Sequence, residues 1–242
     1  MIEIKSRTHT IRLFADGLSR SDLFWPVQYN SYRGDPKKIP FYFKVDQGHS
    51  CVTDLTLGTD ELLALMKSNT RNEIRRAERE GCTFETFDDV DAFIAFYNDF
   101  CASKGLDDYT SKARIGKYEK VLLTKSLHEN AVLAMHANIL DERSKTGLLL
   151  YSCSKRLDAD VDRKMIGWGN RFLHFKDMEY LKSLGYETYD WSGVCLDPND
   201  PRYSIGQFKL AFGGKLVESL TASSPLFSWL EGLRNFLCRF RK

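Results

Sequence analysis

The segment from Tyr186 to Val217 constrains the fold most, because it places an acid, a glycine turn, a lysine and a pair of glycines in one short stretch. Its aromatic start predicts a strand that ends at Asp190 and turns at Gly193. A short predicted helix then carries Lys209 and stops at Gly213-Gly214, where a positive φ costs little. A strand end with an acid beside a helix with a lysine can direct polar groups at one ligand. The segment therefore predicts a ligand site.

The rest of the chain alternates strands and helices in an order typical of an α+β domain rather than a doubly wound parallel sheet. Apolar periodicity, turn residues and helix caps predict the individual elements. Strands are expected at 10–14, 40–45, 51–57, 82–86, 131–140, 147–154 and 215–219, and helices at 59–81, 89–104, 111–127, 167–184, 204–212 and 226–240. We expect residues 1–224 to form a single domain, followed by a C-terminal basic amphipathic helix at 225–242.

Three sequence blocks follow one another between residues 67 and 217. They are Thr70-Arg71-Asn72 with Ile74-Arg75-Arg76-Ala77 and Gly81, then Asn170 through Phe175 to Lys182 and Gly185, then Tyr189-Asp190-Trp191-Ser192-Gly193 with Gly206-Gln207-Phe208-Lys209 and Phe212-Gly213-Gly214. Together the blocks resemble the Fem family of peptidoglycan bridge aminoacyltransferases and its relatives with the GNAT acyltransferase fold. The resemblance implies a GNAT-like fold with a mixed, largely antiparallel central sheet flanked by helices. It implies a donor that is either aminoacyl-tRNA or acyl-CoA.

Composition excludes several other classes of protein. The net charge of +2 and the pI near 8.1 give no global field for nucleic acid, so phosphate binding requires a local patch. The six cysteines are scattered without a C-x-x-C pair, and the N-terminal residues show no signal-peptide pattern, so we expect a cytoplasmic protein. Without a Cys/His cluster at ligand spacing we expect no metal and no permanently bound cofactor.

A stripe of four cations recurs every four residues at Lys67, Arg71, Arg75 and Arg79, and so lies along one side of a helix. Guanidinium groups bind phosphate well, which favours a site for coenzyme A, tRNA or a nucleotide-linked substrate. The alternative is a solvated face balanced by neighbouring glutamates. The family resemblance, in which this helix borders the site, favours ligand binding by Arg71 and Arg75.

The stretch Lys164-Met165-Ile166-Gly167-Trp168-Gly169 has the spacing of a GNAT pyrophosphate loop, and it precedes a predicted helix whose N–H groups can hold phosphate. Lysine stands where that pattern has glutamine or arginine. A plain loop with a glycine turn is the other interpretation.

Asp190 and Lys209 are the candidate catalytic residues. A carboxylate at the strand end can orient the acceptor amine or take its proton, or it can simply cap the following turn. Lys209 can stabilise the oxyanion that forms when an amine attacks an ester or thioester carbonyl. A surface lysine is the alternative, although the flanking aromatic residues favour a partly buried helix. His136 and His174 are expected to be packing residues, with a role as base left open.

The C-terminal stretch from Leu226 to Phe240 places large apolar residues on one helical stripe with Arg239, Arg241 and Lys242 near its end. We expect this helix to pack on the domain. A basic amphipathic helix can also lie in a membrane interface, so peripheral contact with the inner face of the membrane remains open.

We therefore expect an N-acyltransferase that moves an acyl or aminoacyl group from acyl-CoA to an amine acceptor, such as an amino sugar or a nucleotide- or lipid-linked glycan precursor in cell-surface polysaccharide assembly. The chain is short and shows no long charged helical hairpin of the kind that the bridge-forming enzymes use with tRNA. One alternative is an aminoacyl-tRNA-dependent enzyme acting on a peptidoglycan precursor, and the other is a non-catalytic module that binds an anionic ligand. The predicted donor- and substrate-binding residues are Lys67, Arg71, Arg75, Lys164, Gly167, Gly169, Trp191, Gly193, Phe208, Gly213 and Gly214.

Overall fold

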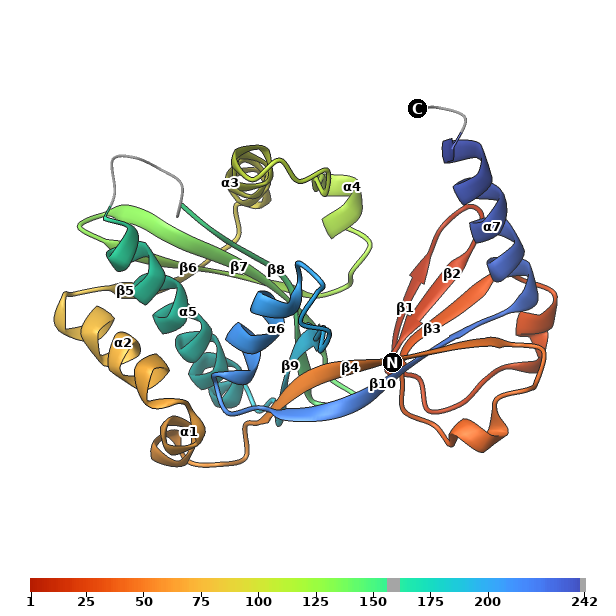
Figure 1. Ribbon diagram of the computed structural model, residues 1–242, viewed down its shortest axis with the longest axis horizontal. Helices are drawn as coiled ribbons and strands as arrows, with labels where there is room; N and C mark the ends of the chain where they lie inside the picture. Colours follow the sequence, from red (N-terminus) through yellow and green to blue (C-terminus); the bar gives the residue numbers. More distant parts are fainter. Residues whose placement is uncertain (156–161, 240–242) are drawn as a thin grey trace. The chain divides into compact units, whose positions relative to one another are not determined.

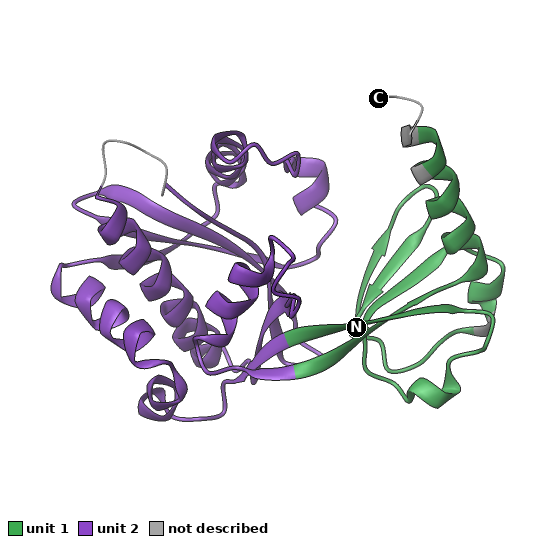
Figure 2. Cartoon of the chain, in the orientation of Figure 1, with its two compact units in different colours: residues 1–50, 217–242 green, residues 51–216 purple. Residues whose placement is uncertain are grey.

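A computed structural model describes residues 1–155 and 162–239 of the chain. The chain divides into two compact units, which we call the terminal unit (Met1–Ser50 and Val217–Lys242) and the central unit (Cys51–Leu216) (Figure 2). Two strands, β4 (Lys44–Asp54) and β10 (Lys215–Ser223), pass from one unit to the other. This grouping differs from the single domain expected for residues 1–224, because the two ends of the chain come together in one unit.

The central unit contains most of the helices and a mixed sheet (Figure 1). Its strand order is β4-β9-β8-β7-β6-β5, in which β5 to β8 pair antiparallel and β8 and β9 pair parallel. The remaining strands are β5 (Thr83–Phe87), β6 (Val121–His128), β7 (Ala131–Asp141), β8 (Thr146–Ser154) and β9 (Thr188–Gly193). The helices are α1 (Thr59–Leu65), α2 (Ser68–Arg79), α3 (Val90–Ser103), α4 (Lys112–Ile115), α5 (Arg163–Ser183) and α6 (Tyr203–Leu210).

Helices cover both faces of this sheet. Because side chains alternate along a strand, β7 sends Met135 and Ala137 toward α3 and sends His136 toward α5. The helix α5 also packs beside α2 and carries Phe175 and Met178 into the largest apolar cluster, which includes Trp191 of β9. This layered arrangement holds α5 firmly over the middle of the sheet.

Local chemistry explains how two of these helices begin and end. Asp162 caps α5, since its side chain accepts a hydrogen bond from the backbone N–H of Lys164 at 2.9 Å. After α6 the chain turns at Gly213, which has a φ of 79°. A Cβ on Gly213 would lie 2.5 Å from the backbone of Leu65, so this turn requires glycine.

The terminal unit has its own strand order, β1-β2-β3-β10. Here β1 and β2 pair antiparallel, β2 and β3 pair parallel, and β3 and β10 pair antiparallel. An apolar cluster that includes Val27, Tyr29 and Ala222 forms its core. Its elements are β1 (Ile2–Lys5), β2 (Thr10–Leu13), β3 (Val27–Tyr32), two short 3-10 helices (Arg20–Leu23 and Pro36–Lys38) and α7 (Pro225–Arg239).

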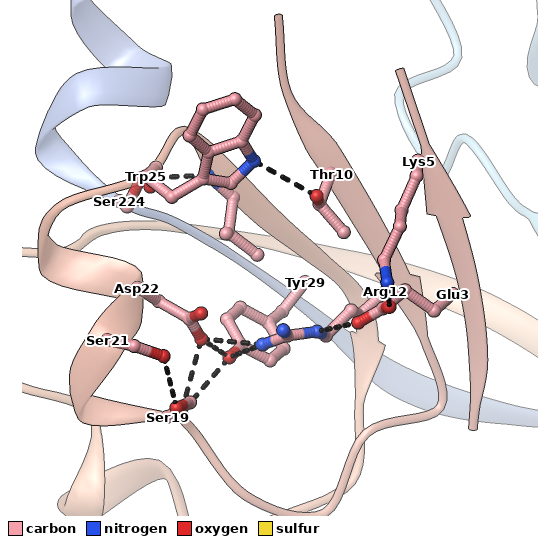
Figure 3. A network of polar contacts seen from close by, with 11 residues as sticks. Glu3, Lys5, Thr10, Arg12, Ser19, Ser21, Asp22, Trp25, Tyr29 and Ser224 are labelled. Atoms are coloured by element: carbon pink, nitrogen blue, oxygen red, sulfur yellow. Dashed lines mark hydrogen bonds and ion pairs between the residues drawn. The ribbon is translucent and has the colours of Figure 1, made fainter. Parts of the chain in front are cut away.

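A polar network crosses the sheet of the terminal unit (Figure 3). The guanidinium of Arg12 donates to Glu3 at 2.7 Å and to both Asp22 and the hydroxyl of Tyr29 at 2.6 Å. That hydroxyl also donates to Asp22 and accepts from the backbone N–H of Ser19. The hydrogen bonds to Arg12 lower the pKa of Glu3, and burial together with Asp22 raises the pKa of Tyr29. Every charged group in this network is thus paired.

Four of the predicted elements are wrong. The predicted helix at 111–127 is only α4, because Val121–His128 pairs with both β5 and β7 as a strand. The strands expected at 40–45 and 51–57 are replaced by one strand, β4, which begins only at Lys44 after a turn at 40–43. The polar stretch around Gly48 is exposed strand rather than a turn. The helix expected at 59–81 is two helices, since the backbone is extended at Met66 and Lys67.

Candidate active site

A pocket of about 580 Å³ opens in the central unit at the place where α2, α5, α6 and β8 meet the end of α3. Four cationic side chains and no aspartate or glutamate line it among the described residues. The lining includes Lys67, Asn69, Lys104, Leu149, Ser152, Cys153, Ser154, Asn170, Arg171, His174, Phe208 and Lys209. The pocket is therefore suited to an anionic ligand.

One wall of the pocket exists because two neighbouring strands diverge. The parallel strands β8 and β9 pair only at their first residues, from Thr146 with Thr188 to Leu148 with Asp190. Beyond Leu148, β8 continues to Ser154 beside β7, and the residues Leu149 and Ser152 to Ser154 line the pocket. The helix α6 lies on the opposite side of the gap and contributes Phe208 and Lys209.

Lys209 lies at this gap in a half-buried position. Its ammonium donates to the backbone carbonyl of Gly193 at 2.9 Å. Burial lowers the pKa of Lys209 from its usual 10.5, an effect that Asp190 and Cys51 oppose. The sequence predicted this lysine as a catalytic residue, and the structure places its charge at the pocket wall.

Asp190 does not line the pocket. The residue is 3% exposed. Its carboxylate accepts a hydrogen bond from the backbone N–H of Ser192 at 2.8 Å, which is the turn-capping arrangement considered from the sequence. It lies near enough to Lys209 to raise the pKa of that amine. Asp190 can thus hold the lysine charge in place, whereas direct contact with an acceptor amine in the pocket requires a movement.

His174 has an unusual environment for an imidazole. The ring lies against His136 at 4.0 Å and Trp191 at 4.9 Å between centroids, tilted to both. It reaches the pocket wall with 1% of the residue exposed. Its Nδ1 atom is buried and has no hydrogen-bond partner among the described residues. Burial, with His136, Lys209 and Arg171 nearby, holds the pKa of His174 well below its usual value, so the ring is neutral.

His136 lies behind His174 and is fully buried. Its Nδ1 atom is 2.7 Å from the Asp177 carboxylate, and its Nε2 atom is 3.2 Å from Oδ1 of Asn170 at the pocket wall. His136, His174 and Asp177 together place two nitrogens and one oxygen within 4.8 Å, a donor set that transition metals use. The hydrogen bond between His136 and Asp177 engages two of those three atoms. The sequence treated the two histidines as isolated packing residues, whereas in the structure their rings lie in contact.

The cationic stripe on α2 divides into residues with different surroundings. Lys67 lines the pocket. Arg71 does not, because its Nη1 donates to the backbone carbonyls of Leu63, Ala64 and Met66 and so caps the C-terminal end of α1. Arg75 is exposed and lies outside the pocket lining.

The predicted pyrophosphate loop is a helix. Residues Lys164, Gly167 and Gly169 all lie in the first two turns of α5, which begins at Arg163. The cap from Asp162 extends the helix earlier than the predicted start at residue 167. Gly169 allows close packing of α5 on β7, since a Cβ there would lie 2.4 Å from a methyl group of Leu133. Residues 156–161, just before α5, lie outside the described residues.

The remaining predicted binding residues support the pocket or lie beside it. Phe208 lines it directly. Trp191 is buried behind His174 and donates through Nε1 to Thr53 at 2.9 Å. Gly193 provides the carbonyl that accepts a hydrogen bond from Lys209. Gly214 lies close to Cys51, since a Cβ on Gly214 would be 2.5 Å from the Sγ atom of Cys51. Gly213 forms the turn described above.

Lys104, Asn170 and Arg171 are among the pocket residues that the sequence did not single out as site residues. Lys104 comes from the end of α3, whose position the sequence does not reveal. Arg171 forms an ion pair with Glu73 at 2.9 Å and lies over the ring of Phe208 at 5.0 Å. The spacing of Asn170, His174 and Asp177 is a signal that was available, because steps of four and three residues place these polar groups on one side of a helix.

Comparison with solved structures gives the fold. FemX matches with a TM-score of 0.68 at 13% identity, covering 96% of this chain and 85% of that chain. L-PGS from Bacillus licheniformis matches with a TM-score of 0.60 at 12% identity, covering 93% and 80%. The DUF2156 C-terminal domain of a protein from Agrobacterium fabrum matches with a TM-score of 0.61 at 14% identity, covering 92% and 80%.

This chain shares the fold of these three proteins. The predicted fold class, α+β with a mixed, largely antiparallel sheet flanked by helices, is confirmed. No protein-family model matches the sequence, and no curated protein matches it in a sequence search.

Proposed function

We propose that the protein is an N-acyltransferase that moves an acyl or aminoacyl group from a phosphate-bearing donor to an amine acceptor. The observation that carries this proposal is the half-buried ammonium of Lys209 at the wall of the pocket where β8 and β9 diverge. A fixed cation at a partly desolvated wall stabilises an oxyanion more than it would in water. The shared fold with FemX and L-PGS is consistent with such a reaction.

The reaction proceeds by direct transfer in a ternary complex. The acceptor nitrogen forms a bond to the donor carbonyl carbon, and the carbonyl oxygen takes the negative charge beside Lys209. The carbon–sulfur or carbon–oxygen bond to the donor then breaks, the leaving group keeps the electron pair, and the amine proton passes to solvent. The Lys209 charge acts mainly in the transition state, so it affects kcat more than donor binding.

The charge of the pocket favours a donor or acceptor with phosphate groups. Lys67, Lys104, Arg171 and Lys209 line it, and only Arg171 has an ion pair with a carboxylate, Glu73, among those described. We favour acyl-CoA as the donor, because one pocket of this size holds a small diphosphate-bearing molecule. Aminoacyl-tRNA remains the alternative donor, and a non-catalytic anion-binding module remains the alternative function.

The acceptor that we propose is an amino sugar or a glycan precursor used in cell-surface polysaccharide assembly. The test offers acetyl-CoA and glucosamine to the protein and measures release of the coenzyme A thiol together with the mass of the acylated sugar. Aminoacyl-tRNA replaces acetyl-CoA in a parallel reaction. Salt-dependent binding of coenzyme A without turnover of either donor would favour the non-catalytic module.

We also propose that α7 makes a peripheral contact with the cytoplasmic face of the membrane. None of the described helices is long and apolar enough to cross a bilayer. However, α7 exposes Trp229 by 64% and Phe236 by 56%, while Phe227 packs against His9. The predicted anchors Arg241 and Lys242 lie outside the described residues, as does the side chain of Arg239. Deleting residues 226–242 should abolish sedimentation with anionic vesicles if the helix binds them, whereas a loss of solubility would favour packing alone.

A further inference from the structure

A band of polar side chains runs between α5 and the sheet of the central unit. Asn170, His174 and Asp177 lie on the side of α5 that faces the sheet, and His136 and Asn138 face them from β7. All except Asn170 are buried. Removing such groups from water is costly unless each finds a partner, which indicates that the band has a function beyond packing.

The hydrogen bonds of this band connect the interior to the pocket. One carboxylate oxygen of Asp177, Oδ2, lies 2.7 Å from Nδ1 of His136, and Nδ2 of Asn138 donates to the same oxygen at 3.5 Å. On its other side, the His136 ring places Nε2 at 3.2 Å from Oδ1 of Asn170. An amide oxygen can only accept a hydrogen bond, so this contact with Oδ1 needs a donating N–H at Nε2 of His136.

With Nε2 of His136 as the donor, this contact holds the Asn170 amide with Oδ1 toward His136. A side-chain amide presents an acceptor and two donors at nearly the same place, so only its partners decide its orientation. Because Oδ1 is engaged by His136, the Nδ2 group is the one that remains for the pocket that Asn170 lines. Lys209 lines the same pocket from α6.

We propose that Asn170 is a catalytic residue whose Nδ2 group donates to the carbonyl oxygen of the acyl donor as that oxygen becomes negative, and that His136 and Asp177 are positioning residues that orient the amide. The ligand group is thus an ester or thioester carbonyl held between an amide N–H and the ammonium of Lys209. This inference rests on the proposed acyl transfer for its catalytic part. The orientation of the amide by His136 and Asp177 is a property of the protein alone.

The orientation is tested without any substrate, by NMR of the side-chain amides in ¹⁵N-labelled protein. Asp177 is joined to Asn170 through His136, so Asp177→Asn should shift the side-chain amide resonances of Asn170. Asn69 is the matched control, because it lines the same pocket but donates to Glu73 at 2.9 Å instead. Unchanged Asn170 resonances in a folded Asp177→Asn protein would overturn the positioning role.

The catalytic part is tested by turnover with acetyl-CoA and glucosamine. Asn170→Asp is isosteric but replaces the donor with an oxygen, and should lower kcat about 100-fold, as loss of one oxyanion donor does in other enzymes. Asn69→Asp places the same charge on the same pocket and should change KM rather than kcat. His136→Gln keeps an N–H that can reach Asn170 and should retain more activity than His136→Leu.

The possible results separate the two proposals. Equal kcat in Asn170→Asp and the wild type, together with a large loss in Lys209→Met, would overturn the role of Asn170 and leave the acyl transfer intact. A wild type without turnover on either donor would overturn the proposed function and the catalytic role of Asn170 together, whereas the NMR shifts would still decide the orientation. Should His136→Leu fail to fold, the Asn170 variants and the NMR comparison decide alone.

Discussion

The two units of this protein each contain a group of interacting polar residues, and the two groups differ in how well their hydrogen bonds are satisfied. In the terminal unit, Arg12, Asp22 and Tyr29 bond to one another, and no atom of the three is buried without a partner (Figure 3). In the central unit, the band between α5 and the sheet leaves Oδ1 of Asp177, Oδ1 of Asn138 and Nδ1 of His174 buried without partners among the described residues. The hydroxyl of Tyr189, near Asp177, is another such atom.

This difference indicates different roles. A fully bonded network stabilises the fold, since each charge has its compensating group. Unpaired buried polar atoms cost stability and persist where a site needs them, and the band of the central unit ends at the pocket through Asn170 and His174. The terminal network should therefore govern stability and the central band should govern activity.

The largest effect on stability is expected from Asp22→Ala. The substitution leaves the largely buried Arg12 without one of its two carboxylates and removes an acceptor from Tyr29. We expect a loss of about 3 kcal/mol in the free energy of unfolding, measured by denaturant titration. Asp46→Ala, which breaks the exposed pair with Lys44, is the control and should change stability little. Equal effects of the two substitutions would contradict the stabilising role of the network.

A matched pair of tyrosine substitutions compares the two units directly. Tyr29→Phe removes a hydroxyl with three partners and should lower stability by about 1–2 kcal/mol. Tyr189→Phe removes a buried hydroxyl without a partner and should leave stability unchanged or raise it. Thermal and chemical unfolding of both variants provides the measurement. A large loss in Tyr189→Phe would show that the band is bonded more completely than the contacts indicate.

A second matched pair separates the cations of α2. Arg71→Ala removes three hydrogen bonds to the end of α1 and should cost about 1 kcal/mol of stability. Arg75→Ala should not change stability. If Arg75 contacts a phosphate, this substitution should weaken the binding of coenzyme A, which calorimetry measures. An Arg71→Ala protein with wild-type stability but weaker binding of coenzyme A would contradict the capping role of Arg71. It would instead favour the phosphate contact predicted from the sequence.

The smallest effect concerns pH. Burial lowers the pKa of Lys209 below 10.5, so its cation is lost at a lower pH than that of an exposed lysine. Because the cationic form is the one that stabilises the oxyanion, kcat should be constant at neutral pH and fall as the pH rises through this lowered pKa. A kcat that instead increases over the same alkaline range would indicate that the neutral amine acts as a base.

The sequence predicted those parts of the fold that depend on local periodicity. The helix expected at 89–104 is α3, and the hairpin expected from 131–140 and 147–154 is β7 and β8. The strand β6 was predicted as helix, because what makes Val121–His128 a strand is its pairing with β5 and β7, and β5 lies about 40 residues earlier in the chain.

The candidate site shows the same limit. Lys209 and Phe208 were found because they lie in one dense segment with Gly213. Lys104 and Asn170 come from separate helices and reach the pocket only through the packing of α3 and α5 on opposite faces of the sheet. Arg71 was predicted as a ligand contact because the sequence cannot show that α1 ends within reach of its guanidinium.

The central claim is that Lys209 stabilises the oxyanion of an acyl transfer in the pocket of the central unit. The most direct test compares kcat for acetyl transfer in Lys209→Met with that in Lys215→Met, an exposed lysine that does not line the pocket. We predict a loss of about 100-fold in kcat for Lys209→Met, with donor affinity and stability close to wild type, and no loss for Lys215→Met. A folded Lys209→Met protein with the wild-type kcat would contradict the account.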